Sequence, residues 1–302
     1  MSETGPRSAA GSEAAASRST VWSASGLDAT SPVGDRQPAG GTVVLPGAPI
    51  SSHTRLVLIP SYNTGARLRQ TVEEALAHWS PVWVVIDGST DGSARLLDDL
   101  VDPAGEHHRP GLVVLQLPTN QGKGAAILYG LRAALQAGFS HALTMDADGQ
   151  HPAELIPAFM TASESAPQAM ILGKPVFDAS APALRVRGRR ISNWWVNLET
   201  FDAGIGDSLF GFRVYPIAPL LQIMLGRRWM RRFDFDAEAV VRLSWHGVTP
   251  VNLDAPVRYL SAAEGGVSHF NYYRDNALLT GMHLRLLGGF LLRGLGRLLR
   301  LG

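Results

Sequence analysis

The 302-residue sequence contains no cysteine and only two lysines, Lys123 and Lys174. The absence of cysteine excludes disulfide bonds, thiolate catalysis and cysteine-ligated zinc, and it is compatible with a reducing compartment. The formal net charge is +1, so the chain lacks the overall excess of basic residues that indicates nucleic-acid binding. We therefore expect no nucleic-acid partner.

Long hydrophobic runs are also missing. No apolar stretch reaches the roughly 18 to 20 residues that span a bilayer, and no apolar secretory core follows Met1. Residues 1–52 are rich in serine, alanine and glycine without hydrophobic periodicity, which predicts a disordered tail. These features predict a cytoplasmic protein whose ordered part begins near residue 53.

Short apolar segments alternate with segments of helical periodicity beyond that point. The expected strands are 56–60, 82–86, 112–115, 141–145 and 169–172, with closing strands at 248–253 and 256–260. The expected helices are 68–79, 93–101, 125–137 and one from residue 153 onward. This alternation predicts an α/β fold with a parallel, doubly wound sheet. Polar or glycine-rich turns follow the strands, so they should meet at one sheet edge, where such folds bind nucleotides.

The most informative turn contains two aspartates one residue apart, Asp146 and Asp148. They follow an expected strand, and Pro152 behind them suits the first turn of a helix. Residues i and i+2 of a strand point to the same side, so both carboxylates could face one cation such as Mg²⁺ or Mn²⁺. The alternative is a turn rich in aspartate and glycine that binds no metal.

Two further turns contain candidate substrate contacts. Asp87 ends an apolar strand, where its carboxylate could accept hydrogen bonds from a nucleoside or could cap the next helix. In the segment 120–124, Asn-Gln-Gly-Lys-Gly, the glycines allow close approach and Lys123 could neutralise phosphate. The spacings of a Walker A loop and of a dinucleotide-binding G-x-G-x-x-G turn are both absent.

These motifs together resemble glycosyltransferase family 2, which has a GT-A fold. The matching segments are IPSYN at 59–63, DGSTDGS at 87–93, NQGKG at 120–124, DADGQHP at 146–152 and GFR at 211–213. Within the family, the chain resembles the branch of dolichol-phosphate mannose synthases and their bacterial relatives. The segment 265–276 also resembles glycosyltransferases of bacterial aryl-polyene and lipid pathways. The resemblance implies a Rossmann-like, mostly parallel sheet flanked by helices, with a helical extension on the acceptor side.

The resemblance also implies roles for individual residues. The residues with implied roles in donor, metal or phosphate binding are Pro60, Tyr62, Asn63, Asp87, Lys123, Asp146, Asp148, Gln150 and Arg213. Asp87, Pro60 and Tyr62 would form the nucleoside pocket. Asp146, Asp148 and Gln150 would hold the metal and the donor diphosphate, and Arg213 would face the phosphates. Thr64 and Ile86 stand where family members often have acids, which leaves the preferred base open.

The implied catalytic domain is 53–262, with a nucleotide-sugar half at 53–175 and an acceptor half at 176–262. In the acceptor half, Arg185, Arg187, Arg189 and Arg190 precede Trp194, Trp195 and Leu198. Arginine suits phosphate and tryptophan suits a lipid interface, but a solvated basic face with a buried tryptophan pair is the alternative. Lys174 is either a replacement cation near phosphate or a surface lysine. A hydroxyl acceptor needs a base, and the candidates are Asp236, Glu238 and Asp207.

The last segment, 263–302, has the pattern of an amphipathic helix. Its leucines at 284, 287, 291, 295, 298 and 299 share one face, and Arg293, Arg297 and Arg300 share the opposite one. This pattern is typical of helices that lie on anionic membranes. We expect a membrane tether outside the catalytic core; the alternative is a helix that packs on the core or on a second copy.

The combined prediction is a metal-dependent, inverting glycosyltransferase. It would move a sugar from a UDP- or GDP-sugar to a lipid-linked or polyprenyl-phosphate acceptor, at the inner face of the cytoplasmic membrane. One alternative is an inactive sugar-nucleotide-binding scaffold, although a dead site has no reason to keep Asp148, Gln150 and Arg213. The other is a nucleotidyltransferase, but the turn after the first strand, 61–65, lacks the basic, glycine-rich loop of that class.

Overall fold

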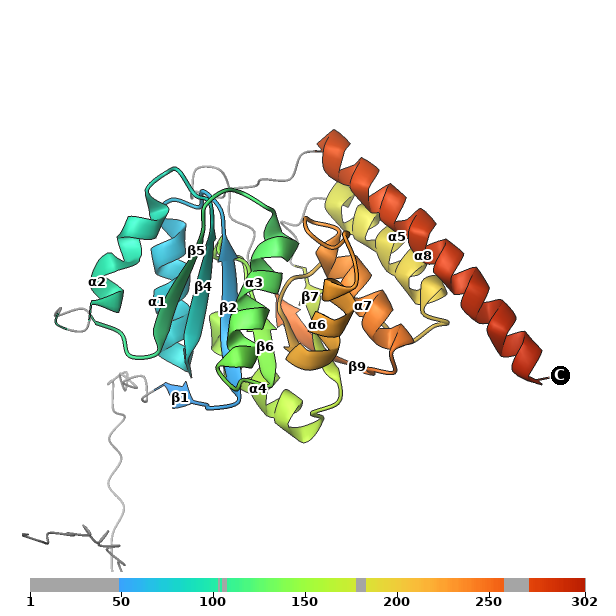
Figure 1. Ribbon diagram of the computed structural model, residues 1–302, viewed down its shortest axis with the longest axis horizontal. Helices are drawn as coiled ribbons and strands as arrows, with labels where there is room; N and C mark the ends of the chain where they lie inside the picture. Colours follow the sequence, from blue (N-terminus) through green and yellow to red (C-terminus); the bar gives the residue numbers. More distant parts are fainter. Residues whose placement is uncertain (1–48, 103, 105–107, 178–182, 258–271, 302) are drawn as a thin grey trace, which may run out of the picture. The chain divides into compact units, whose positions relative to one another are not determined.

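The computed structural model describes residues 49–301 except 103, 105–107, 178–182 and 258–271 (Figure 1). The chain divides into two compact units, Met1–Leu45 and Pro46–Gly302, and all described residues belong to the second unit. The predicted tail therefore lies almost entirely outside the described residues. The same is true of most of the segment 265–276.

A seven-stranded sheet forms the centre of the second unit, in the order β5-β4-β2-β6-β8-β7-β9. The strands are β2 (Arg55–Ser61), β4 (Val82–Asp87), β5 (Leu112–Leu117), β6 (His141–Thr144), β7 (Met170–Val176), β8 (Arg213–Pro216) and β9 (Pro250–Pro256). All neighbours pair in parallel except β8, which is antiparallel to β6 and β7. The short strands β1 (Ile50–Ser51) and β3 (Trp79–Ser80) form a separate parallel pair. The prediction of a mostly parallel α/β sheet is confirmed.

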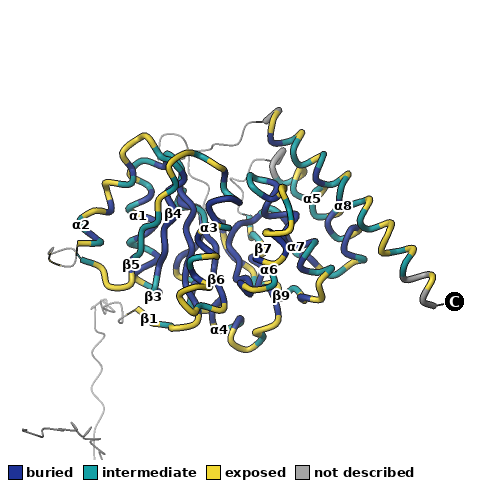
Figure 2. Tube along the Cα trace, viewed as in Figure 1, coloured by how far each residue is buried: buried dark blue, intermediate teal, exposed yellow. Residues whose placement is uncertain are grey.

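Side chains of β2 show how this sheet is stabilised. Leu56 and Leu58 point to one face and Val57 and Ile59 to the other, and all four are fully buried in two separate clusters. The first cluster includes α3 (Lys123–Gln136), α6 (Ile217–Leu225) and α7 (Phe235–Trp245), and the second includes α1 (Arg67–His78) and α4 (Ile156–Ser165). Figure 2 shows the central strands buried between these layers. Burial on both faces explains why the strands are continuous apolar runs.

Three predicted boundaries differ from the structure. The expected helix 93–101 is a 3₁₀ helix, η1 (Ser93–Leu97), followed by a short helix, α2 (Asp98–Val101). Arg69 donates a hydrogen bond to the backbone carbonyl of Leu96 at 2.8 Å, so a side chain satisfies that carbonyl. Another 3₁₀ turn, η2 (Ala153–Leu155), precedes α4, and β9 replaces the two expected closing strands within the described residues.

Two long helices, α5 (Ala183–Glu199) and α8 (Tyr272–Leu301), contact each other, and Figure 1 shows them next to each other. Met282 and Leu286 of α8 are fully buried. The guanidinium of Arg285 lies 3.1 Å from a carboxylate oxygen of Glu238 on α7. The prediction that the C-terminal segment stands outside the core is therefore wrong for the first half of α8, because its buried face packs against α5 and α7.

The outer face of α8 is apolar. Leu284, Leu291, Leu295 and Leu299 are all more than half exposed, whereas the Arg293 guanidinium lies 4.1 Å above the ring of Trp245 on α7. Among the described side chains, the exposed leucines therefore lie apart from Arg293, which contacts α7. The side chains of 297, 298 and 300 lie outside the described residues. No helix in the described part of the chain is long and apolar enough to cross a membrane.

Candidate active site

A cavity of about 1110 Å³ lies between the carboxyl ends of the central strands and the helices α5 and α8. Predicted site residues on its wall are Pro60, Tyr62, Asp87, Lys123, Asp146, Asp148, Gln150 and Asp236. They come from four separate turns and from α7, so the fold brings together residues that are distant in sequence. Asn63 and Arg213 are the two predicted site residues that are not on the described part of the wall.

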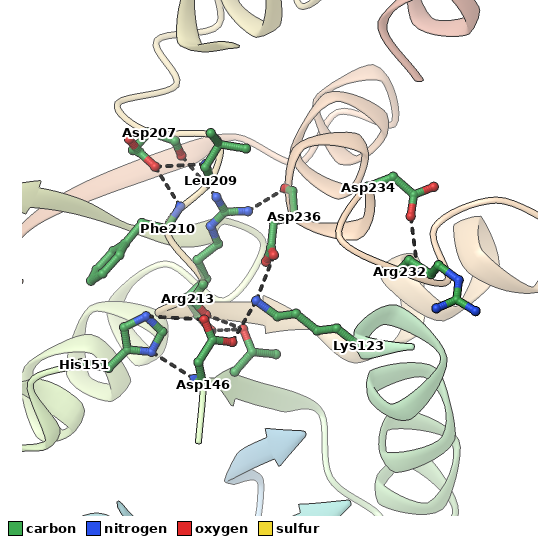
Figure 3. A network of polar contacts seen from close by, with 12 residues as sticks. Lys123, Asp146, His151, Asp207, Leu209, Phe210, Arg213, Arg232, Asp234 and Asp236 are labelled. Atoms are coloured by element: carbon green, nitrogen blue, oxygen red, sulfur yellow. Dashed lines mark hydrogen bonds and ion pairs between the residues drawn. The ribbon is translucent and has the colours of Figure 1, made fainter. Parts of the chain in front are cut away.

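Lys123, on the cavity wall, contacts two acids (Figure 3). Its Nζ atom lies 2.7 Å from Oδ1 of Asp146 and 2.8 Å from Oδ2 of Asp236. Burial disfavours the charged amine, but the two carboxylates outweigh this effect and raise the pKa of Lys123. The same pairing, against the opposing effect of burial, lowers the pKa of Asp146. Both groups are therefore ionised at neutral pH.

Asp148 lies on the same wall, and no described basic side chain forms an ion pair with it. Burial and the negative charge of Asp146 raise the pKa of Asp148 to about 6. Its Oδ1 atom accepts a hydrogen bond from the backbone N–H of Gln150 at 3.0 Å. The two carboxylates are partly exposed on one wall and repel each other, and carboxylate oxygens are the ligands that hard divalent cations prefer. The described residues contain no group of three acidic or histidine side chains that could hold a metal alone.

His151 fixes the turn that contains both aspartates, a role that the sequence patterns do not reveal. Its Nδ1 atom accepts a hydrogen bond from the backbone N–H of Asp146 at 2.9 Å. Burial lowers the pKa of His151 to about 4, which keeps the ring neutral and able to accept this bond. The ring also packs edge-on against Phe210, at 4.7 Å between centroids. The only signal in the sequence is its place within the 146–152 motif.

Arg213 lies below the cavity wall and not on it. Its side chain is fully buried, and it donates hydrogen bonds to the backbone carbonyl of Asp236 at 2.6 Å and to the hydroxyl of Tyr215 at 2.9 Å. A third bond reaches the carbonyl of Asp207 at 3.2 Å. The guanidinium thus holds the start of α7, and with it the Asp236 carboxylate, in place. This position differs from the predicted one facing the phosphates.

Gly211, two residues before Arg213, leaves room for the ion pair. A Cβ atom at this position would lie 2.9 Å from Nζ of Lys123 and 3.0 Å from Oδ2 of Asp146. Contacts of this length are tighter than ordinary van der Waals contacts, so any larger residue would push the charged groups aside. The glycine of the GFR segment therefore has a steric role.

Asp87 has a different local role from either sequence alternative. Its two carboxylate oxygens accept hydrogen bonds from the backbone N–H groups of Gln121 and Gly122, each at 2.8 Å. The acid therefore fixes the turn that presents Lys123. Asn63 joins the first two turns in a similar way, because its Oδ1 atom accepts a bond from the N–H of Thr90 at 2.8 Å.

Only one of the three base candidates lies on the described cavity wall, and it is Asp236. Oδ1 of Asp207 accepts three hydrogen bonds, from Arg189 at 2.7 Å and from two backbone N–H groups. Glu238 is fully buried and pairs with Arg242 at 2.6 Å and with Arg285. Oδ1 of Asp236, in contrast, has no hydrogen-bond partner among the described residues. We therefore retain Asp236 and set aside the other two.

The helices complete the cavity with arginine and apolar side chains. Arg189, Ile191 and Trp195 of α5 lie on the wall, together with the leucines at 279, 284 and 287 of α8. Trp194 is 60% exposed, so the tryptophan pair is not buried as a unit. Lys174 lies 3.6 Å from the exposed Asp254 and does not line the described cavity, which makes it a surface lysine. The side chain of Arg185 lies outside the described residues.

Comparison with known proteins identifies the family. The model for glycosyl transferase family 2 matches residues 56–225, more than half of the chain. The chain is 33% identical over 229 residues to undecaprenyl-phosphate mannosyltransferase of Micrococcus luteus, covering 70% of this chain and 85% of that protein. It is 29% identical over 230 residues to polyprenol monophosphomannose synthase of Mycolicibacterium smegmatis, covering 70% and 79%.

Solved structures agree on the fold. A glucosyl-3-phosphoglycerate synthase from Mycobacterium tuberculosis, in complex with UDP, matches with a TM-score of 0.53 at 15% identity, covering 78% of this chain and 80% of that one. The same enzyme with Mn²⁺, UDP-glucose and phosphoglyceric acid matches with a TM-score of 0.51, covering 80% and 79%. With the family match and the mostly parallel sheet, the chain belongs to glycosyl transferase family 2 and is a glycosyltransferase with a GT-A fold.

Proposed function

We propose that this enzyme is a metal-dependent, inverting glycosyltransferase that moves a sugar from a UDP- or GDP-sugar to a polyprenyl phosphate. The observation that carries the proposal is the amphipathic cavity, with acids and Lys123 at one end and apolar side chains of α5 and α8 at the other. A sugar nucleotide suits the charged end, and a lipid phosphate suits the apolar end. The names of the two bacterial relatives specify undecaprenyl phosphate and polyprenol monophosphomannose, which supports this acceptor class.

The nucleoside would lie over the ends of β2 and β4. Pro60 and Tyr62 line the cavity there, next to Asp87. Each carboxylate oxygen of Asp87 accepts one backbone hydrogen bond, and an ionised oxygen has a second lone pair available. Asp87 would therefore contact a ribose hydroxyl or a base N–H while it holds the Lys123 turn.

The diphosphate would lie beside Asp146 and Asp148, which together with Gln150 would hold a divalent cation. The raised pKa of Asp148 favours this assignment, because a cation would relieve the repulsion from Asp146. When bound, the cation would act as a Lewis acid that neutralises the leaving diphosphate. The glucosyl-3-phosphoglycerate synthase of similar fold has a structure with Mn²⁺ and UDP-glucose, which is the precedent for Mn²⁺ or Mg²⁺ here.

Lys123 would supply a second positive charge to the donor phosphates. Asp236 keeps its Nζ atom in position, and Arg213 keeps Asp236 in position through the backbone carbonyl. The acceptor phosphate is already an anion, so its oxygen can attack the anomeric carbon without a base. Attack from the side opposite the diphosphate inverts the anomeric configuration. With a hydroxyl acceptor, the unpartnered Oδ1 of Asp236 would be the base.

The apolar faces of α5 and α8 would lie on the inner face of the cytoplasmic membrane. Ile191 and Trp194 of α5 and Leu284 and Leu291 of α8 are each at least 60% exposed. Exposed apolar side chains on two adjacent helices are typical of an interaction site, and a lipid acceptor requires access to the bilayer. Membrane association would therefore bring the cavity to its acceptor.

A transfer assay tests the proposal. The full chain is incubated with Mn²⁺ or Mg²⁺, a panel of UDP- and GDP-sugars, and undecaprenyl phosphate in liposomes. We expect release of UDP or GDP with one donor, formation of a glycolipid of inverted configuration, and loss of both on addition of EDTA. Asp148→Asn is the matched inactive control.

Two outcomes would overturn the proposal. Saturable donor binding without turnover on any acceptor would indicate an inactive scaffold. Release of pyrophosphate from a sugar phosphate and a nucleoside triphosphate would indicate a nucleotidyltransferase. Transfer to a hydroxyl acceptor alone would retain the enzyme class and change the acceptor.

A further inference from the structure

A buried carboxylate orients a histidine on the acceptor side of the cavity. Glu199, at the end of α5, is fully buried, and its Oε1 atom accepts a hydrogen bond from Nδ1 of His283 on α8 at 2.9 Å. Burial raises the pKa of Glu199, and the hydrogen bond from His283 opposes that shift. His283 lines the cavity next to Trp195, with 6.1 Å between ring centroids.

The orientation of the ring leaves one nitrogen available. With Nδ1 bound to Glu199, the opposite edge of His283 presents Nε2. No described residue forms a hydrogen bond with Nε2, and the atom is not fully buried. Because Nδ1 is occupied by the hydrogen bond to Glu199, Nε2 is the ring atom that can share a proton with an acidic headgroup such as a phosphate monoester.

His283 lies where the character of the cavity changes along α8. The cavity-facing residues of this helix, in order, are Arg274, Asn276, Leu279, Thr280, His283, Leu284 and Leu287. Most of those before His283 are polar, and both of those after it are leucine. An amphiphile in this cavity would have its headgroup at that boundary, with its chain along the leucines.

The pair does more than join two helices. Isosteric apolar residues generally join elements at equal or greater stability than a buried ion pair, because burying charge is costly. The charges around the pair are Glu238 on α7, which adds to the negative charge near Glu199, and Arg242 and Arg285, which neutralise Glu238. Among the described residues, His283 is the only group with a hydrogen bond to the Glu199 carboxylate, since Oε2 of Glu199 has no partner.

We propose that Nε2 of His283, oriented by Glu199, binds the phosphate headgroup of the prenyl phosphate acceptor. This assignment rests on the acceptor class proposed above. It makes His283 a specificity-determining residue that distinguishes a prenyl phosphate from the corresponding alcohol. Glu199 is the positioning residue, since it acts only through the ring.

Calorimetric titration of the full chain with geranyl phosphate and with geraniol tests the assignment directly. Wild type should bind the phosphate more tightly than the alcohol. His283→Gln should weaken binding of geranyl phosphate by at least about tenfold, as expected for a lost charge-assisted hydrogen bond, and leave geraniol binding unchanged. His283→Arg should restore part of the preference, and Glu199→Gln should reduce it less than His283→Gln does.

His246→Gln is the matched control, because His246 is exposed at the end of α7 and does not line the described cavity. Thermal unfolding of each variant reports whether it folds. The assignment is overturned if His283→Gln binds both ligands as wild type does, or if a folded His283→Gln loses both equally.

The transfer assay separates this inference from the proposed function. Raised acceptor KM in His283→Gln, with unchanged kcat and unchanged hydrolysis of the donor, supports both. Phosphate-selective binding that depends on His283, without any transfer to prenyl phosphate, would overturn the proposed function alone. Transfer with an unchanged acceptor KM in His283→Gln would overturn this inference alone.

Discussion

The two ends of the cavity are built in different ways. At the proposed donor end, residues from separate turns are fixed by short contacts, such as Lys123 to Asp146 and Asp87 to the backbone of Gln121. At the proposed acceptor end, two adjacent helices supply the wall and expose apolar side chains such as Trp194 and Leu291. The donor end thus has its charged groups fixed before a ligand binds, whereas the acceptor end exposes apolar surface to water.

The strongest test of the donor end is Asp148→Ala. Removing one ligand of the proposed cation should lower kcat by about a thousandfold, or about 4 kcal/mol in barrier, with the fold intact. Steady-state kinetics and circular dichroism measure both. Asp254→Ala replaces an exposed acid away from the cavity and should keep the kcat and the fold of wild type. Activity of Asp148→Ala within about tenfold of wild type, or about 1.4 kcal/mol, would contradict the assignment.

At the acceptor end, the buried face and the exposed face of α8 should have different effects on folding and on membrane binding. Leu286→Ala removes a fully buried side chain and should lower the free energy of unfolding by about 3 kcal/mol. Leu291→Ala, at a position 60% exposed, should leave unfolding unchanged and weaken sedimentation with anionic liposomes. Equal effects of the two substitutions on urea unfolding would show that the faces are misassigned.

Asp87→Asn tests whether Asp87 stabilises the turn that presents Lys123. The amide replaces one acceptor oxygen with an NH₂ group, so one of the two backbone bonds is lost. We expect a loss of about 1 to 2 kcal/mol in unfolding free energy, and a rise in donor Kd larger than the change in kcat. Calorimetry and single-turnover kinetics separate these quantities. Unchanged donor Kd with a large loss of turnover would place Asp87 elsewhere in the mechanism.

The smallest expected effect is on stability without metal. Burial and Asp146 raise the pKa of Asp148 from 3.8 to about 6. A carboxyl group with a raised folded-state pKa adds stability below its unfolded pKa, and this stability is lost as pH rises through the folded pKa. Asp148→Asn removes the titration. With EDTA present, it should gain about 1 kcal/mol over wild type as pH rises from about 4 to about 7, because solvent screening of the partly exposed carboxyl group reduces the full effect of the shift.

Urea unfolding at several pH values measures this difference. Addition of Mn²⁺ and UDP should stabilise wild type and not Asp148→Asn. A stability difference that stays constant with pH would show that Asp148 titrates normally.

Sequence patterns predicted the donor end better than the acceptor end. The strands were predictable because apolar runs such as 56–60 have one dominant structure when buried on both faces. The turn motifs located Asp146 and Asp148, because parallel strands end at one edge. The role of Arg213 was not predictable in the same way, since a short motif does not show whether a guanidinium faces a ligand or a backbone carbonyl.

The division of α8 also depends on tertiary structure. Its leucine periodicity predicted an amphipathic helix, but periodicity does not show which face meets α5 and α7. The Glu199–His283 pair joins residues 84 positions apart, and neither residue belongs to a motif. Such pairs are visible only once the helices are packed.

The ion pair between Lys123 and Asp146 depends on the absence of a side chain at Gly211. Lys123 and Asp146 stay in contact because no side chain projects from Gly211, in the loop before β8. A single methyl group there would separate the charges without changing the total charge of the protein. The electrostatics of the donor end are therefore controlled by the volume of a residue that bears no charge itself.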